Sequence, residues 1–253
     1  MDLESGHNSE SSSKQSNGIS QKNIETETNK RDIEILPETT NKSDLSFKII
    51  IIGDSFVGKS SLANKAIKNK FDNLYSATLG FDYFSFFVKI DDKILKLQIW
   101  DTCGQEIYQS LITNFYRNSS LAIMVYSIDN RTSFEHIDNW LKEIKINSNP
   151  DAKVFLIGNK ADLDKVRVVT YEEAEKYANE LEFSKFYETS AKSGFNAQKI
   201  FIEAAYLLYD EYIGYKSSQS HNTSIISESS ITQKLTNSYE SNNGSKDKSK
   251  ECC

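Results

Sequence analysis

The sequence has few of the features that mark secreted or membrane-spanning proteins. Only three of its 253 residues are cysteines, too few for a disulfide framework. No apolar segment follows a basic start, so we expect no secretory signal. The longest apolar runs, Ile49–Ile52 and Leu121–Val125, are far too short to span a bilayer. Because the second residue is Asp2 instead of Gly, we expect no N-terminal myristoylation, and we expect any membrane attachment to use the C-terminus.

Positive charge is not in excess, and apolar residues are scarce. The formal net charge is −6 and apolar residues make up 38% of the chain. The acidic balance argues against a nucleic-acid-binding protein, which needs a basic surface. The apolar shortfall is confined to residues 1–45 and 216–253, which are rich in Ser, Asn, Glu and Lys. The roughly 170 residues between these ends can bury a sizeable core.

The polar composition of the two ends predicts three regions. Residues 1–45 show no hydrophobic periodicity and are expected to be disordered, either as a neutral extension or as a partner-binding arm. Residues 46–213 are expected to fold, and residues 214–253 to form a flexible tail. From Lys216 onward the tail holds five Lys and four acidic residues, so it is no polybasic anchor for anionic lipids.

The middle region alternates between strand and helix patterns. Alternating strands and helices predict an α/β fold with a six-stranded, mostly parallel sheet and helices on both faces. Asp91 and Asp92 suggest a tight hairpin, and therefore one antiparallel edge strand. Thr132 and Thr170, each followed three residues later by Glu, resemble helix-capping boxes. The expected strands cover residues 47–52, 81–90, 93–100, 121–128, 154–158 and 183–188.

The string GDSFVGKS follows the first of these strands and precedes a helical pattern. It matches the phosphate-loop motif G-x-x-x-x-G-K-[ST] in the context that the motif requires. Gly53 and Gly58 allow the backbone to curl, so that its N–H groups face phosphate oxygens. Lys59 adds a positive charge where a helix begins, and the Ser60 hydroxyl can bind Mg²⁺. The alternative is a glycine-containing turn that matches by chance.

Three further strings end later strands. In WDTCGQE, Asp101 could reach a metal, the Gly104 N–H could contact a γ-phosphate, and Gln105 could orient an attacking water. By itself this string could also be an ordinary strand end and turn. In GNKADL, the Asp162 carboxylate could accept from the N1–H and the 2-amino group of guanine, which adenine cannot match. In ETSAKS, the backbone around Ala191 could donate to the guanine 6-oxo group.

In this order, the motifs resemble those of the Ras superfamily of small GTPases, and their detail is similar to the Rab branch. The resemblance covers about residues 46–213 and the two terminal cysteines. It implies a phosphate-loop G domain in which Phe71 flanks the guanine ring and Thr78 binds Mg²⁺ and the γ-phosphate. It also implies that an aromatic triad contacts effectors and that the terminal cysteines each carry a geranylgeranyl group. The triad is Tyr83, Trp100 and Phe115, and the lipidated residues are Cys252 and Cys253.

The resemblance assigns roles to further residues. The catalytic residues are Gln105, which positions water for in-line attack on the γ-phosphate, and Lys59, which stabilises phosphate charge. Mg²⁺ is held by Ser60, Thr78 and Asp101. The residues that bind GTP or GDP are Gly53, Asp54, Ser55, Val57, Gly58, Lys59, Ser60, Ser61, Phe71, Tyr75, Thr78, Gly104, Asn159, Lys160, Asp162, Ser190, Ala191 and Lys192.

The activity implied is a GTP/GDP switch that hydrolyses GTP and regulates vesicle traffic. The expected location is the cytoplasmic face of an intracellular membrane, with a slight preference for the Golgi. The membrane-bound protein is expected to exchange with a pool in the cytosol. Expected partners are an exchange factor, a GTPase-activating protein, a GDP-dissociation inhibitor, the prenylation machinery and effectors. The membrane is bound through C-terminal lipids, a monomer is expected, and nucleic acid is not a partner.

Several residues depart from the family pattern. Phe56 stands where the family usually has a small residue, and its ring is expected to point out of the phosphate loop. Cys103, Ile107 and Tyr83 replace the usual Ala, basic residue and Phe. Phe56 motivates one alternative, a nucleotide-binding scaffold with little hydrolysis. A phosphate-loop ATPase or kinase is the other, against which the NKAD and ETSAK strings argue. Without lipids, the terminal cysteines would be two exposed thiols on a flexible tail.

Overall fold

The computed structural model describes residues 31–72, 78, 80–103 and 115–220. Its strands and helices follow the alternation that the sequence predicts. The strands are β1 (Ile33–Leu36), β2 (Leu45–Ile52), β3 (Phe81–Ile90), β4 (Lys93–Thr102), β5 (Leu121–Ser127), β6 (Lys153–Asn159) and β7 (Lys185–Glu188). The helices are α1 (Lys59–Lys68), α3 (Arg131–Glu135), α4 (Ile137–Asn147), α5 (Tyr171–Glu180) and α6 (Lys199–Ser220), with a short 3₁₀ helix, η2 (Ala161–Val166).

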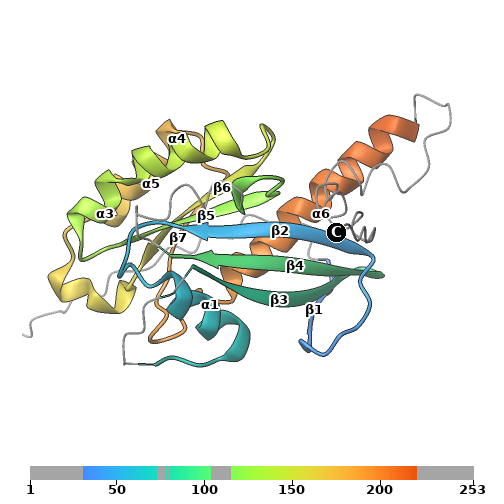
Figure 1. The fold of residues 1–253 in the computed structure, drawn as a ribbon, viewed down its shortest axis with the longest axis horizontal. Helices are drawn as coiled ribbons and strands as arrows, with labels where there is room; N and C mark the ends of the chain where they lie inside the picture. The colour runs from blue at the N-terminus through green and yellow to red at the C-terminus, as the bar shows by residue number, and fades with distance from the viewer. Residues whose placement is uncertain (1–30, 73–77, 79, 104–114, 221–253) are drawn as a thin grey trace, which may run out of the picture. The chain divides into compact units, whose positions relative to one another are not determined.

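The strands form one sheet in the order β1-β3-β4-β2-β5-β6-β7 (Figure 1). The pairs β2–β4, β2–β5, β5–β6 and β6–β7 are parallel, whereas β3 runs antiparallel to β4. The β3–β4 hairpin turns at Asp91, whose φ of 54° lies in the left-handed region that Asp tolerates. The predicted α/β fold with a mostly parallel sheet is therefore confirmed.

The sheet has seven strands instead of the six expected, because residues 33–36 add β1. This strand pairs antiparallel with the far half of β3, from Ile33 opposite Ile90 to Leu36 opposite Phe87. Ile33 packs against the core, and Pro37 follows the strand without an N–H for a further ladder bond. The expectation of disorder for residues 1–45 is thus wrong for residues 33–36, and its first 30 residues lie outside the described part. The expected flexible tail, 214–253, is likewise wrong for residues 214–220, which belong to α6, and the rest of it lies outside the described part.

The two faces of the sheet are covered by different helices. Along β2, Ile49 and Ile51 join the core cluster that contains α1 and α6. Ile50 and Ile52 point to the opposite face and join the cluster that contains α3, α4 and α5. Figure 1 shows the same division, with α3, α4 and α5 on one side of the strands and α1 on the other. Helices therefore lie on both faces, as the sequence predicts.

The ends of several elements determine where the motifs lie. Because β2, β4, β6 and β7 run parallel, their carboxyl ends meet at one edge of the sheet. The four motifs lie at these ends, so the fold brings them together. The capping prediction holds for Thr170, whose hydroxyl accepts from the Glu173 N–H. It is wrong for Thr132, since the Asn130 side chain caps α3 instead. No described helix is long and apolar enough to cross a bilayer.

Candidate functional site

The phosphate loop connects β2 to α1 and requires glycine at two positions. Gly53 has a φ of 135°, and a Cβ there would lie 2.1 Å from the carbonyl oxygen of Val125. Gly58 has a φ of 91°, and a Cβ there would lie 2.5 Å from Nδ2 of Asn159. Both side chains are excluded by backbone conformation and by space. The loop therefore has the close, curled backbone that phosphate binding needs.

Lys59 begins α1 and is only 5% exposed. Its ammonium donates to the backbone carbonyls of Gly53 and Asp54, each at 2.7 Å. Burial lowers the pKa of Lys59 to about 8, although the carboxylates of Asp101 and Asp54 oppose the shift. The side chain thus carries a poorly solvated cation at the mouth of the loop. A polyphosphate bound there would stabilise the charged form.

Two hydroxyls and one carboxylate converge beside Lys59. The Ser60 and Thr78 hydroxyl oxygens are 2.7 Å apart and share a hydrogen bond. Asp101 is fully buried, and within the described residues neither of its carboxylate oxygens has a hydrogen-bond partner. Burial raises the pKa of Asp101 to about 6; the nearby Ser60 hydroxyl, whose hydrogen bond in this structure is to Thr78, and the Lys59 ammonium oppose the shift. A buried carboxylate without donors, next to two hydroxyls, fits a Mg²⁺ ion, which takes oxygen ligands.

Phe56 lies in the phosphate loop with a φ of 67°, in the left-handed region. A bulky residue is uncommon in this conformation, which costs roughly 1–2 kcal/mol. The Phe56 side chain is 65% exposed, so its ring does not fill the loop. The expectation that the ring points out of the loop agrees with this exposure.

Asn159, at the end of β6, ties the phosphate loop to the loop after β7. Its Nδ2 donates to the Val57 carbonyl at 2.8 Å. Its Oδ1 accepts from the Thr189 hydroxyl at 3.1 Å and from the Ala191 N–H at 3.3 Å. Every contact is made by a buried side-chain amide. Asn159 therefore links the phosphate loop to the loop after β7, and its side-chain amide is not free to contact a base.

Asp162 lies in η2 and is exposed, so its carboxylate can be reached by a ligand. One oxygen accepts from the Ser190 hydroxyl at 2.6 Å, and Ser190 in turn accepts from the Ser193 N–H at 3.0 Å. Lys160 takes the left-handed conformation before η2, with its ammonium 3.6 Å from Asp129. The carboxylate is thereby oriented before any base arrives.

Arg167 stabilises the segments on either side of Asp162 and Ser190 through its ion pairs. Its guanidinium binds both carboxylate oxygens of Glu188, at 2.5 and 2.9 Å. It also binds Asp164 at 2.8 Å, and both Arg167 and Glu188 are mostly buried. A bidentate pair fixes the relative position of the segments that it joins. The segment after η2 is thus tied to the start of the ETSAKS loop.

The remaining predicted residues fall into two groups. Ser55 lies in the phosphate loop, Ser61 in the first turn of α1, and Lys192 is exposed in the last loop. Phe71 is partly buried and packs against the core cluster of α1 and α6. Five predicted residues lie outside the described part of the chain: Tyr75, Gly104, Gln105, Cys252 and Cys253.

The predicted aromatic triad is one contiguous cluster, and it has a fourth member. The Trp100 ring lies 5.2 Å from Tyr83 and 5.4 Å from Phe115, between ring centroids. Phe81 lies 4.5 Å from Phe115 and 5.2 Å from Trp100, and is 43% exposed. Sequence reasoning missed Phe81. Its spacing of two from Tyr83 in a strand was the available signal, because such residues share a face.

Sequence reasoning also missed the surroundings of Asp54. Its carboxylate binds Nδ1 of His136 and Nε1 of Trp140, at 2.7 and 2.9 Å. Trp140 is one of the buried residues of α4. Nothing in the local sequence pairs residues more than 80 positions apart, so this contact requires the fold.

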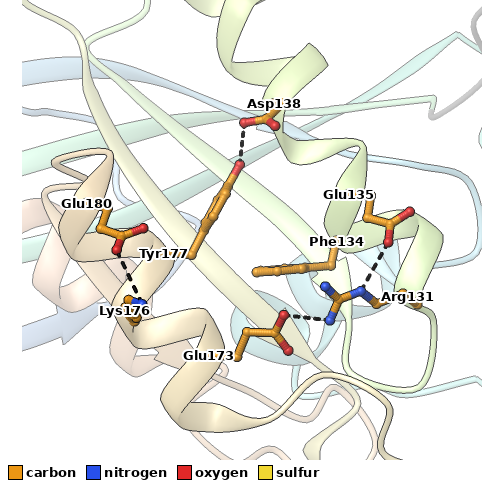
Figure 2. A pocket seen from close by; sticks show the side chains of 8 residues that line it. All are labelled: Arg131, Phe134, Glu135, Asp138, Glu173, Lys176, Tyr177 and Glu180. Atoms are coloured by element: carbon orange, nitrogen blue, oxygen red, sulfur yellow. Dashed lines mark hydrogen bonds and ion pairs between the residues drawn. The ribbon is translucent and has the colours of Figure 1, made fainter.

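A separate hollow of about 330 Å³ lies between α3, α4 and α5. Figure 2 shows that its charged side chains bind one another: Arg131 contacts Glu135 and Glu173, and Lys176 contacts Glu180. The motif residues do not line this hollow, so it is distinct from the phosphate loop and from the loops around Asp162.

The geometry joins a phosphate loop, a buried carboxylate with two hydroxyls, and an oriented acid at the edge of one sheet. Comparison with known families agrees with it: the model of the Ras family matches residues 48–210, more than half of the chain. Domains of this family are small GTPases that switch between GTP and GDP, and they typically bind Mg²⁺. The protein therefore belongs to the Ras family of small GTPases.

Proposed function

We propose that the protein is a Rab-type small GTPase that regulates vesicle traffic at the cytoplasmic face of an intracellular membrane. The observation that carries this proposal is the aromatic cluster of Phe81, Tyr83, Trp100 and Phe115. Phe81 and Tyr83 are each 43% exposed, although both are large aromatic side chains. Clustered exposed aromatic residues are typical of protein-recognition surfaces.

The position of this cluster suits a surface that responds to the bound nucleotide. Phe81 lies three residues after Thr78, whose hydroxyl binds that of Ser60 at the phosphate loop. Trp100 directly precedes Asp101, the buried carboxylate. A change at the phosphates would therefore reach the cluster through two short segments of chain. Such coupling between a ligand and a recognition surface is what a switch requires.

Membrane attachment is proposed to depend on Cys252 and Cys253, which lie outside the described residues. One lipid chain gives only marginal binding, whereas two give stable anchoring, at about 0.8 kcal/mol per buried CH₂. The tail has little net charge to help, as its Lys and acidic residues nearly balance. Two adjacent cysteines can carry the two lipid chains that stable anchoring requires. The remaining proposed partners are an exchange factor, a GTPase-activating protein and a GDP-dissociation inhibitor.

Lipid transfer tests the Rab assignment directly. The full chain is incubated with the Rab-type geranylgeranyl transferase, and its intact mass is measured. We expect two geranylgeranyl groups on the wild type, one on Cys252→Ser or Cys253→Ser, and none on the double variant. In cells, the tagged wild type should coincide with one membrane marker, while the double variant should be cytosolic. A wild type that accepts no lipid, or a double variant that still pellets with membranes, would contradict the proposal.

The exposed Phe56 favours one second candidate, a nucleotide-binding scaffold with little hydrolysis. Single-turnover hydrolysis, measured with and without an activating protein, separates the two. A Ras-like switch should hydrolyse GTP at about 10⁻⁴ per second alone and roughly 10³–10⁵-fold faster with an activator that supplies an arginine. Gln105→Leu should remove most of that activity. A wild type that stays slow with every such activator would favour the scaffold.

A further inference from the structure

Asp54, the second residue of the phosphate loop, is held by the helices on one face of the sheet. Its Oδ2 lies 2.7 Å from Nδ1 of His136, and its Oδ1 accepts from the Trp140 indole N–H at 2.9 Å. Both carboxylate oxygens are therefore engaged by residues more than 80 positions away in sequence. The Asp54 side chain is 20% exposed, so these contacts lie at the boundary of the core.

A carboxylate in this loop presents an electrostatic problem, because the loop is proposed to bind a polyanion. Two like charges 4 Å apart repel by about 4 kcal/mol at an effective dielectric of 20. A fixed carboxylate that is bound to donors cannot turn toward the phosphates. His136 and Trp140 thus hold the Asp54 charge in one place and supply the donors that satisfy it.

The same residue also holds Lys59. The Asp54 backbone carbonyl accepts from the Lys59 ammonium at 2.7 Å. Any shift of Asp54 would therefore move an acceptor of the cation that faces the phosphates. The side chain of Asp54 binds the helices and its backbone binds Lys59, so the residue connects the two.

The two donors, His136 and Trp140, lie on helices that are bonded to α5. His136 is the junction between α3 and α4, and Trp140 is buried in the following turn. On the other side of these helices, α5 contributes two bonds that Figure 2 shows. Arg131 binds Glu173 at 2.6 Å, and the Tyr177 hydroxyl donates to Asp138 at 2.7 Å.

We propose that His136 and Trp140 are positioning residues that hold the phosphate loop through Asp54 and so set how long a guanine nucleotide stays bound. The proposal rests on the proposed nucleotide binding by this loop. Neither residue needs to touch the nucleotide. Losing either donor should loosen the loop and speed nucleotide release.

The test measures dissociation of a fluorescent GDP from the full chain, chased with excess GDP in the presence of Mg²⁺. A hydrogen bond to a charged group is strong enough that His136→Ala or Trp140→Phe should speed release by about tenfold. His136→Asn keeps an N–H near the Nδ1 position and should restore release to within about threefold of the wild type. Glu135→Gln changes the charge beside His136 without touching Asp54, and should leave release within about twofold.

A double-mutant cycle separates positioning from a general structural effect. In an Asp54→Ala background, His136→Ala should change the release rate by less than about twofold, because its partner is already absent. Thermal unfolding of each variant identifies any that fail to fold. If Trp140→Phe fails to fold, His136→Asn still tests the proposal. Additive effects in the cycle, or wild-type release from His136→Ala, would overturn the proposal. A wild type that retains no GDP would instead overturn nucleotide binding itself.

Discussion

The two halves of the candidate nucleotide site differ in how far their polar groups are satisfied. On the phosphate side, Asp101 is fully buried, and neither of its oxygens has a partner in the described residues. Among the described residues, the Lys59 ammonium donates its hydrogen bonds to backbone carbonyls of its own loop. On the base side, by contrast, Asp162 binds Ser190 and Asn159 is fully engaged. One half holds buried charged groups with few hydrogen bonds, and the polar groups of the other half are already bonded to one another.

This difference assigns different tasks to the two halves. Buried charged groups with few hydrogen bonds are costly until a ligand supplies further partners, so the phosphate side should contribute most of the affinity. A set of donors and acceptors fixed in advance discriminates between ligands, because a wrong base leaves a group unpaired. The phosphate side should therefore determine how tightly a nucleotide binds, and the base side which nucleotide.

The largest expected effect is that of Lys59→Ala on affinity. Removing the cation should weaken GTP binding by at least about 3 kcal/mol, or more than 100-fold, because charged hydrogen bonds are lost. The preference for GTP over ATP should persist. Lys160→Ala is the matched control on the base side, since its ammonium lies near Asp129, and it should cost less than about tenfold. Equilibrium titration with labelled GDP measures the affinity of both variants. Equal losses of affinity would contradict the proposed difference between the phosphate side and the base side.

Asp101→Asn should have opposite effects on stability and on metal binding. Burial raises the pKa of Asp101 from 3.8 to about 6, which corresponds to roughly 3 kcal/mol. Because the folded state then holds the proton more tightly, this cost appears as the pH rises from about 4 to about 6. At pH 7 the variant should unfold at higher denaturant concentration than the wild type, both free of nucleotide and metal.

The same substitution should abolish the tightening of GDP binding by Mg²⁺, because a neutral amide is a poor ligand for the ion. Denaturant unfolding at pH 4 and pH 7, with the wild type beside the variant, measures the first effect. Nucleotide release with and without EDTA measures the second. A variant that is less stable than the wild type at pH 7 would show that Asp101 is satisfied in the free protein.

Arg167→Lys tests the closed half and should have an intermediate effect. Lysine keeps the charge but cannot bind both Glu188 oxygens, so we expect a loss of about 1–2 kcal/mol in the free energy of unfolding. Arg167→Ala should cost more, as it leaves the mostly buried Glu188 carboxylate unpaired. Chemical denaturation monitors both variants. A loss below about 0.3 kcal/mol for Arg167→Ala would mean that the base side is not held by this pair.

Phe56→Gly should have the smallest effect. Relief of the left-handed conformation gains roughly 1–2 kcal/mol, and the flexibility of glycine in the unfolded chain offsets about 0.5–1 kcal/mol of it. A net gain of at most about 1 kcal/mol is expected in denaturant unfolding. Intrinsic hydrolysis should change by less than about tenfold, or 1.4 kcal/mol of barrier. A much larger increase in rate would identify Phe56 as a brake and favour the scaffold function.

The sequence predicts the site well where function depends on contiguous residues. The phosphate loop and Asp162 follow strands, and Asp101 lies near the end of one. Parallel strands bring their ends together, so periodicity and motif spacing suffice. Two kinds of feature could not be predicted. The four residues of β1 lie in a polar segment and form a strand only because β3 offers an edge. The contact of Asp54 with His136 depends on packing across 82 positions.

Competition between GTP and ATP tests whether the protein is a guanine-nucleotide switch. Labelled GDP is bound to the wild type and to Asp162→Asn, and each unlabelled nucleotide is titrated against it. For the wild type, GTP should displace the label at concentrations at least about 10³-fold lower than ATP, because Asp162 leaves an unmatched acceptor with adenine. Asp162→Asn should bind GTP several kcal/mol more weakly and lose most of the preference. Equal competition by ATP and GTP against the wild type would show that the site does not select guanine.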